Sequence, residues 1–274
     1  LSLAAASLDN TNGKLRALGS DGTTLLNLGR SLDNTNGKLR ALGSDGTTLL
    51  NLGGTLDNTN GRLESANQNL QLNLGGLTNA NGTLLHVGTG TFGLGLPLLQ
   101  NAGGSVTSNG TLTLSGSSWT NSSTLQVANL VVNVDNLTQT GSGQLLASNS
   151  FNGNGGNWTN DGLISAGGNF SLALGGTYQG AGRLSSGYDF TLNAGQLLLD
   201  NPNARLTAGN GTTTFNIGGL LRNQARITSA GNFTLNAGQV DNRGTLGAAG
   251  NLTINTPTLT NQNSSLIFSG GDMG

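Results

Sequence analysis

Apolar and polar residues alternate in short segments along the chain, and three kinds of segment recur in a fixed order. The first has an apolar residue followed two positions later by asparagine, as in Leu8 and Asn10. The second reads Gly-x-Leu, as at residues 13–15, and the third alternates strictly, as in NFTL at residues 232–235. Alternation with a period of two is typical of a strand with one buried face. Each repeat is therefore expected to contain three short strands.

The repeats follow one another at a mean spacing of about 21 residues, which is typical of solenoids. Residues 7–29 return unchanged as residues 31–53. Thirteen repeats are recognised by their first apolar residue: Leu8, Leu32, Leu56, Leu77, Leu99, Trp119, Leu137, Trp158, Tyr178, Leu199, Leu221, Val240 and Leu259.

These repeats predict an all-β fold. The chain contains 47 glycines, and apolar residues nowhere follow a helical period, so a helical solenoid is disfavoured. Three strands and three turns fit into so few residues only if each strand pairs with its counterparts in the neighbouring repeats. We therefore expect a parallel β-helix (β-solenoid) of about thirteen coils, each of about 19–24 residues with three short strands. Glycine and asparagine would supply corners with positive φ, and parallel crossovers predict a right-handed winding.

Residues 1–274 are interpreted as a single β-helical repeat domain and as part of a longer array. Residues 1–76 contain the near-identical 24-residue coils. Residues 77–118 are irregular, and Pro97 indicates a strand bulge or a local loop there. Residues 119–274 contain regular coils of about 20 residues.

The composition excludes several classes of function. The formal net charge is −1, so no global field would attract nucleic acid. The chain has no run of eighteen apolar residues, and we expect no membrane span. With no cysteine, disulfides and thiol metal sites are ruled out.

Charged residues concentrate in the first coils. The four charges of the first coil recur in its copy, and because they balance we expect them to pair across coils. These residues are Asp9, Lys14, Arg16 and Asp21, followed by Asp33, Lys38, Arg40 and Asp45.

Candidate catalytic residues are few. His86 is the only histidine, no G-x-S-x-G motif accompanies it, and we expect it in a turn or at the surface. Hydrolysis of a polysaccharide would require clustered carboxylates, for which Asp161, Asp189 and Asp200 are the candidates. We predict no catalytic, cofactor-binding or metal-binding residues, no cofactor and no enzymatic activity.

Two further sets of residues occupy matching positions in successive coils. Arg183, Arg205 and Arg226 would form a basic ladder, interpreted as a solvated strand face or, alternatively, as a stripe for an anionic glycan or a partner protein. The large aromatic residues are expected to stack inward as structural ladders rather than to bind sugars. They are Trp119, Trp158 and Tyr178 in the first segment, and Phe170, Phe190, Phe215 and Phe233 in the third.

Several coils resemble the hemagglutinin repeats of filamentous hemagglutinin and related two-partner secretion exoproteins, which include the large toxins of contact-dependent growth inhibition. The similar stretches are NWTNDGLISAGGNFSL at residues 157–172, LLRNQARITSAGNFTLNAGQ at 220–239 and VDNRGTLGAAGNLTI at 240–254. The resemblance implies a β-helical shaft that is exported by a dedicated outer-membrane transporter and is secreted or held at the bacterial cell surface. The family's NPNG and NPNL secretion motifs are absent, because Asn201-Pro202-Asn203 is followed by Ala204 in the middle of the array.

The leading hypothesis is a stalk that presents an adhesive or toxic tip to other cells, in adhesion or contact-dependent growth inhibition. A receptor or glycan on the target cell would then be bound through neighbouring segments. Two alternatives remain: the coils themselves bind a receptor or glycan, or the chain is a β-helical polysaccharide-degrading enzyme.

Overall fold

The computed structural model describes residues 1–19, 22–100 and 102–274. Within these residues the chain has 31 strands and one four-residue helix, α1 (Leu96–Leu99). The strands pair in parallel and stack as a β-solenoid of about 13 turns. Paired residues lie from 19 to 24 positions apart, as for Leu145 with Ile164 and Leu8 with Leu32. The predicted parallel β-solenoid is therefore confirmed, while its right-handed winding stays a prediction.

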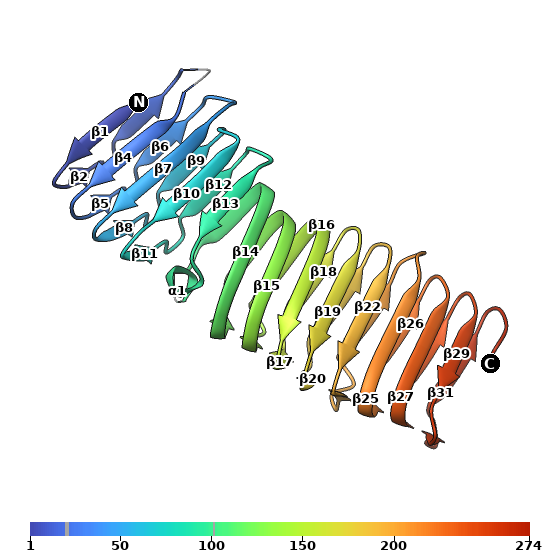
Figure 1. The fold of residues 1–274 in the computed structure, drawn as a ribbon. Helices are drawn as coiled ribbons and strands as arrows, with labels where there is room; N and C mark the ends of the chain where they lie inside the picture. Colours follow the sequence, from blue (N-terminus) through green and yellow to red (C-terminus); the bar gives the residue numbers. More distant parts are fainter. Residues whose placement is uncertain (20–21, 101) are drawn as a thin grey trace. The chain divides into compact units, whose positions relative to one another are not determined.

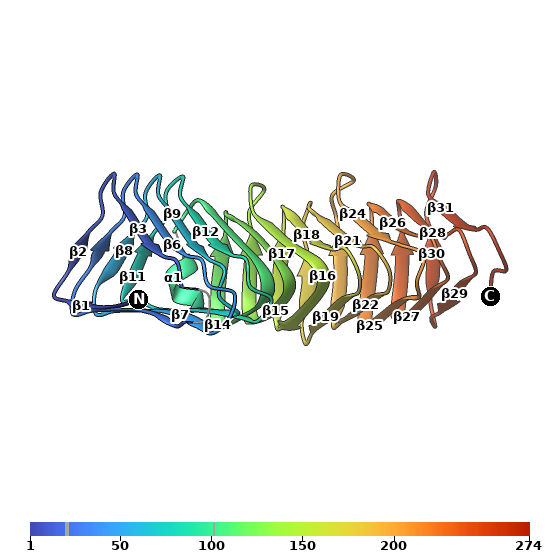
Figure 2. The same cartoon turned by 90° about the horizontal axis from the view of Figure 1, so that it is seen from above.

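The described residues form two compact units. Unit 1 consists of Leu1–Ser115 and Asn121–Val131, and unit 2 of Gly116–Thr120 and Val132–Gly274. In each unit, successive coils lie side by side with their equivalent strands aligned (Figures 1 and 2). We number the three strands of a coil in the order in which the repeat was defined.

Unit 1 contains the longest coils. Its first strands are β2 (Leu8–Asp9), β5 (Leu32–Asp33), β8 (Thr55–Asp57) and β11 (Gly76–Thr78). Its second strands are β3 (Lys14–Ala17), β6 (Lys38–Ala41), β9 (Arg62–Ser65) and β12 (Thr83–His86). Its third strands are β1 (Ser2–Ala5), β4 (Thr24–Leu28), β7 (Thr47–Leu52), β10 (Asn69–Asn73) and β13 (Thr91–Leu94). Strand β14 (Ser105–Asn121) pairs with both β12 and β13.

Unit 2 repeats the same order. First strands are β17 (Asn157–Asn160), β20 (Thr177–Gln179), β23 (Gln196–Leu199), β30 (Leu259–Asn261) and the end of β15 (Thr124–Gln139). Second strands are the start of β16 (Gln144–Gly155), then β18 (Leu163–Ala166), β21 (Arg183–Ser186), β24 (Arg205–Ala208), β26 (Arg226–Ser229), β28 (Thr245–Ala248) and β31 (Leu266–Ser269). Third strands include β19 (Phe170–Leu174), β22 (Phe190–Ala194) and β29 (Leu252–Asn255), whereas β25 (Thr213–Asn223) and β27 (Phe233–Asn242) continue from a third strand into the next first strand.

Two of the thirteen repeat markers are wrong. Leu197, not Leu199, pairs with Tyr178 and Leu221, because the turn after β23 is longer than in the neighbouring coils. Leu99 is buried but lies in α1, which stands where a strand was expected. The bulge or loop predicted around Pro97 is instead this helix, with the proline in its first turn, where a missing N–H costs nothing.

Phenylalanine rings stack through the core of unit 2. Neighbouring ring centroids lie 4.7–5.1 Å apart along the series Phe151, Phe170, Phe190, Phe215 and Phe233. Phe215 is not in register with the others, since its backbone pairs with Leu192 and Leu235. Its ring nevertheless reaches both neighbouring phenylalanines from the adjacent inward position.

Asparagine side chains form a second, polar ladder inside the corner after the first strand. In unit 1 the amide of Asn34 donates to Asn58 at 2.7 Å, and that of Asn58 donates to Asn79 at 2.7 Å. In unit 2 Asn223 donates to Asn242 in the same way at 2.8 Å. These residues are buried, so each amide is satisfied by its copy in the next coil.

Tyr178 substitutes for a missing asparagine in this ladder. Gly180 stands at the asparagine position of its coil, and the buried Tyr178 hydroxyl accepts the hydrogen bond from the Asn160 amide at 3.0 Å. Burial raises the pKa of Tyr178, so the hydroxyl keeps its proton. A different side chain thus supplies the same hydrogen-bonding group.

Tyr178→Phe is expected to lower the free energy of unfolding by about 1–3 kcal/mol, because one N–H of Asn160 would remain buried without an acceptor. Urea unfolding followed by circular dichroism measures this change. Tyr188→Phe is the matched control, since Tyr188 is 56% exposed and should unfold like the parent chain. Equal stability of the two variants would contradict the assigned role of Tyr178.

Candidate functional site

Basic side chains gather on the outward side of the second strands, here called the basic face. At the first outward position of the strand, Lys14, Lys38 and Arg62 are in register in unit 1. Arg183, Arg205 and Arg226 hold the same position in unit 2. With Arg16 and Arg40, these make eight of the 11 lysines and arginines, whereas Glu64 is the only acidic residue among the described ones that lies on these second strands. A near-neutral chain therefore carries strongly segregated charge.

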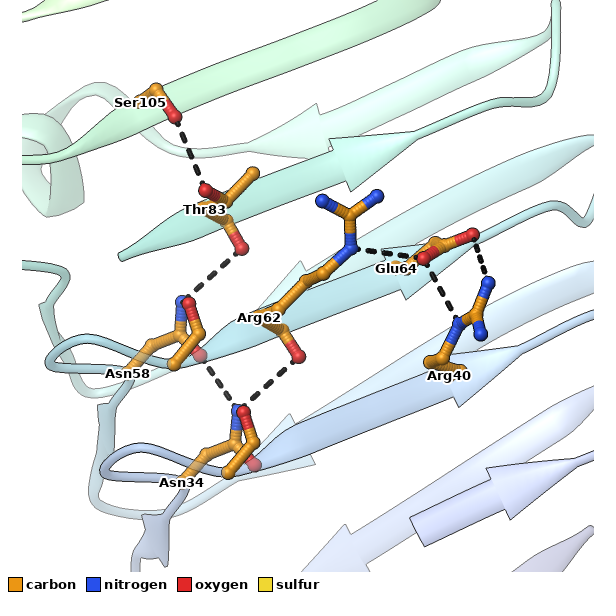
Figure 3. Close-up of polar contacts among 9 residues, drawn as sticks. Asn34, Arg40, Asn58, Arg62, Glu64, Thr83 and Ser105 are labelled. Atoms are coloured by element: carbon orange, nitrogen blue, oxygen red, sulfur yellow. Dashed lines mark hydrogen bonds and ion pairs between the residues drawn. The ribbon is translucent and has the colours of Figure 1, made fainter. Parts of the chain in front are cut away.

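In unit 1 one carboxylate lies within the basic face. Glu64 accepts hydrogen bonds from Arg40 at 2.9 and 3.0 Å and from Arg62 at 3.0 Å (Figure 3). The hydrogen bond from Arg40 is the largest cause that lowers the pKa of Glu64, so the carboxylate stays ionised at neutral pH. This cluster is a local ion-pair network, and its groups are occupied with one another.

The predicted pairing of charges across the first coils is found, among the described residues, only for Arg40, which pairs with Glu64 of the next coil. Asp9, Asp33 and Asp57 stack in register on the first strands, whereas the lysines stack on the second strands. Among the described residues of these coils, only Glu64 forms ion pairs with a base. Asp21 lies outside the described residues. Like charges stack on like charges because equivalent residues of successive coils are in register.

In unit 2 the three arginines line a shallow groove together with Asn203, Thr207 and Thr228. Arg205 donates to the backbone oxygens of Pro202 and Ala204, at 2.5 and 2.7 Å. The residues that continue the column on either side are Leu163 and Thr245, so no carboxylate neutralises it in register. Guanidinium groups beside hydroxyls could bind a carboxylate, phosphate or sulfate.

The three candidate catalytic aspartates do not come together. Asp161 and Asp200 line a groove beside the first strands of unit 2, whereas Asp189 lies in the turn between β21 and β22. Asp200 is paired with Arg222, whose hydrogen bond lowers the pKa of that carboxyl. Glycoside hydrolysis requires one carboxyl that is held protonated. Asp200 is therefore poorly suited to be the acid.

His86 is buried, and its predicted place in a turn or at the surface is wrong. Its Nε2 lies 3.1–3.2 Å from the backbone oxygens of Gln68 and Asn67, which can only accept, so Nε2 carries the proton. Nδ1 then accepts from the Ser108 hydroxyl at 2.9 Å. Burial lowers the pKa of His86, and the neutral ring links its own coil to the coils before and after it. It faces inward because it lies two residues after the buried Leu84.

The aromatic residues at the first apolar position of the repeat are also buried. Trp119, Trp158 and Tyr178 are each 1% exposed, so their rings offer no surface for sugar stacking. Trp158 donates its Nε1 proton to the Val134 oxygen at 2.7 Å, whereas the buried Nε1 of Trp119 has no hydrogen-bond partner among the described residues.

Neither a metal centre nor a membrane helix is evident in the part of the chain that the structure describes. No group of three or more histidine, cysteine, aspartate or glutamate residues there is placed to bind a metal ion. No described helix is long and apolar enough to cross a bilayer.

Comparison with known proteins identifies no relative: no family model matches the chain, and no curated protein or solved structure is found to be similar. The resemblance to hemagglutinin repeats thus stays a prediction from the sequence.

The buried His86 predicts a stability that depends on pH. Its pKa in the folded chain lies below the ordinary value of 6.5, so the unfolded chain binds the proton first. The free energy of unfolding should be fully present above about pH 7 and should fall as the pH drops through about 6.5. Urea midpoints measured from pH 7.5 to about 5.5 test this.

His86→Gln is the matched variant, because it removes the only imidazole in the chain. The variant is expected to be less stable at pH 7.5 but to lose most of the dependence on pH in this range. An equal loss of stability in both proteins would show that His86 is not the titrating group.

Proposed function

We propose that the chain is the β-solenoid stalk of a large secreted or cell-surface bacterial exoprotein. It would present an adhesive or toxic tip to other cells, in adhesion or in contact-dependent growth inhibition. The observation that carries this proposal is the continuous stacking of second strands from coil to coil within each unit.

Such stacking suits a stalk because the length of the solenoid increases with the number of coils. Each coil adds one strand spacing of about 4.8 Å and buries the open face of the coil before it. The identical coils of unit 1 pair residue for residue, as Lys14 to Ala17 do with Lys38 to Ala41. A second identical coil adds height without adding a new kind of site.

The sequence resemblance supports the remaining parts of the proposal. The proposed partners are an outer-membrane transporter of the two-partner type during export and a target-cell receptor or glycan contacted through neighbouring segments. A chain without cysteines suits export in an unfolded state, since no thiol can cross-link on the way.

A second candidate is that the coils themselves bind a receptor or glycan. The arginine groove of unit 2 favours it, because three in-register guanidinium groups have no carboxylate in their column. The enzyme alternative has less support, because its carboxylates are divided between two corners and Asp200 is paired with Arg222.

Removal of residues 7–30 should leave a folded chain that is one coil shorter. Strand β1 now pairs with β4, and after the deletion it would meet the same sequence, TTLLNL, in β7. Circular dichroism and cooperative thermal unfolding are expected to persist. Removal of residues 7–18, half a coil, is the control: the segment left between β1 and β4 is too short to form a coil, so β1 should lose its pairing and the protein should unfold at a lower temperature than the whole-coil deletion, while the later strands keep their partners. Failure of the whole-coil deletion to fold would contradict the interchangeable coils that a stalk requires.

Labelled chain incubated with bacterial and animal cells distinguishes the two candidates. A stalk predicts no saturable binding by this chain, together with binding by a longer protein that includes the neighbouring segments. Saturable binding that is lost in Arg183→Gln/Arg205→Gln/Arg226→Gln would instead place the receptor site on these coils. Lys14→Gln/Arg16→Gln/Lys38→Gln removes the same number of charges elsewhere and serves as the control.

A further inference from the structure

Two columns of opposite charge flank one corner of unit 1. Asp9, Asp33 and Asp57 form the acidic column on β2, β5 and β8. The basic column, formed by Lys14, Lys38 and Arg62, lies five residues after the aspartates in the same coils, on β3, β6 and β9. Both columns have one residue per coil, so the same strand spacing of about 4.8 Å separates their charges.

The acidic column is held in a fixed orientation. One carboxylate oxygen of each aspartate accepts a hydrogen bond from the backbone two residues later, at 2.8 Å from Thr11, 2.9 Å from Thr35 and 2.9 Å from Thr59. Hydrogen bonding by Thr11 lowers the pKa of Asp9, which is therefore ionised at neutral pH.

The corner between the columns is rigid. Buried Asn34 and Asn58 are joined by a hydrogen bond of 2.7 Å, and Asn34 also reaches the backbone oxygen of Arg62 at 3.4 Å (Figure 3). These hydrogen bonds hold the backbones that carry the two columns on either side of the corner. Among the described residues, the three aspartates and two lysines form no ion pair.

Each column is unfavourable on its own, because like charges directly opposite on neighbouring strands repel. A surface of opposite charge with the same spacing would relieve this repulsion in both columns. The same corner of a second copy offers such a surface, since its acidic column complements the basic column and its basic column complements the acidic one.

We propose that unit 1 associates side by side with a second copy of this chain, the acidic column of each copy facing the basic column of the other. A two-fold axis makes such a contact self-complementary and closed, as in most homodimers. The middle coil would place Lys38 opposite the partner copy's Asp33, and the first coil would place Lys14 opposite the partner copy's Asp9, while Arg62 keeps Glu64 as its ion-pair partner. The association goes beyond the proposed stalk, and it would join stalks laterally.

Unit 2 has a basic column but no acidic column beside it. Beside Arg183, Arg205 and Arg226, the first strands present Gln179, Leu198 and Arg222 at the position that the aspartates hold in unit 1. That corner is therefore not self-complementary. The comparison makes unit 1 the docking surface and unit 2 the internal control.

Sedimentation equilibrium of the whole chain tests the proposal. A dimer is expected in about 20 mM NaCl, and it should dissociate in about 500 mM, because the screening length falls from about 20 Å to about 4 Å. The dissociation constant should rise at least about tenfold between these conditions. A monomer at both salt concentrations would overturn the proposal.

Charge reversal provides the decisive variants. Lys14→Glu/Lys38→Glu makes both columns predominantly acidic, and Asp9→Lys/Asp33→Lys makes both basic, so each variant alone is expected to be monomeric in low salt. An equimolar mixture of the two should form a heterodimer, since opposite columns meet again. Arg183→Glu/Arg226→Glu reverses the same number of charges in unit 2 and should leave the dimer unchanged.

Circular dichroism and thermal unfolding of each variant establish that it is folded. Asp9→Asn/Asp33→Asn keeps an oxygen for the threonine N–H groups while removing the charge, and it should weaken the dimer without unfolding the corner. Failure of the mixed variants to associate would overturn the proposal even if the parent chain dimerised. A monomeric parent that binds dextran sulfate through Lys14 and Lys38 would show that the basic face takes an external polyanion instead.

Discussion

Each coil depends on its neighbours for its backbone hydrogen bonds. The N–H of Lys38 bonds to Gly13 and that of Arg62 to Gly37, each in the preceding coil. Because parallel pairing fixes the register, a side chain that points inward or outward lies beside its own counterpart one coil away. The sequence of one repeat therefore determines whole columns. Stacked leucine and phenylalanine side chains stabilise one another by packing, and stacked asparagine side chains do so by amide hydrogen bonds.

The polar corner shows what this constraint requires. Asn36, Asn60 and Asn81 adopt φ near 53°, and the glycine that follows Asn60 has no room for a Cβ beside the Asn34 oxygen. These turns bring the backbone close to the buried amides of the ladder. Gln139, which donates to Leu163 at 2.8 Å, and Tyr178 show that the corner needs a hydrogen-bonding group rather than asparagine itself.

The fold could be predicted from the sequence because two periods, alternation within a strand and recurrence after about 21 residues, together leave few arrangements. The errors arose where chemical type was given more weight than position. Alternation counted from Leu84 places His86 inside, although its polarity suggested a turn. Asn201, two positions after Leu199, mimics the asparagine of the repeat, yet it belongs to a longer turn and its oxygen accepts from the Asn203 N–H at 2.8 Å. The ladder asparagines could have been placed inside by the same alternation rule.

Net charge is a poor guide to the surface of such a fold. A repeat with balanced charges looks neutral along the chain, but its aspartate and its lysine lie on different strands, on either side of one corner. Duplication of residues 7–29 as 31–53 added as many positive as negative charges, and left the total unchanged. It also lengthened an acidic column and a basic column by one residue each. Because backbone register fixes both columns, every copied coil adds one charge to each of them. Repetition can therefore build a strongly charged surface from a nearly neutral sequence.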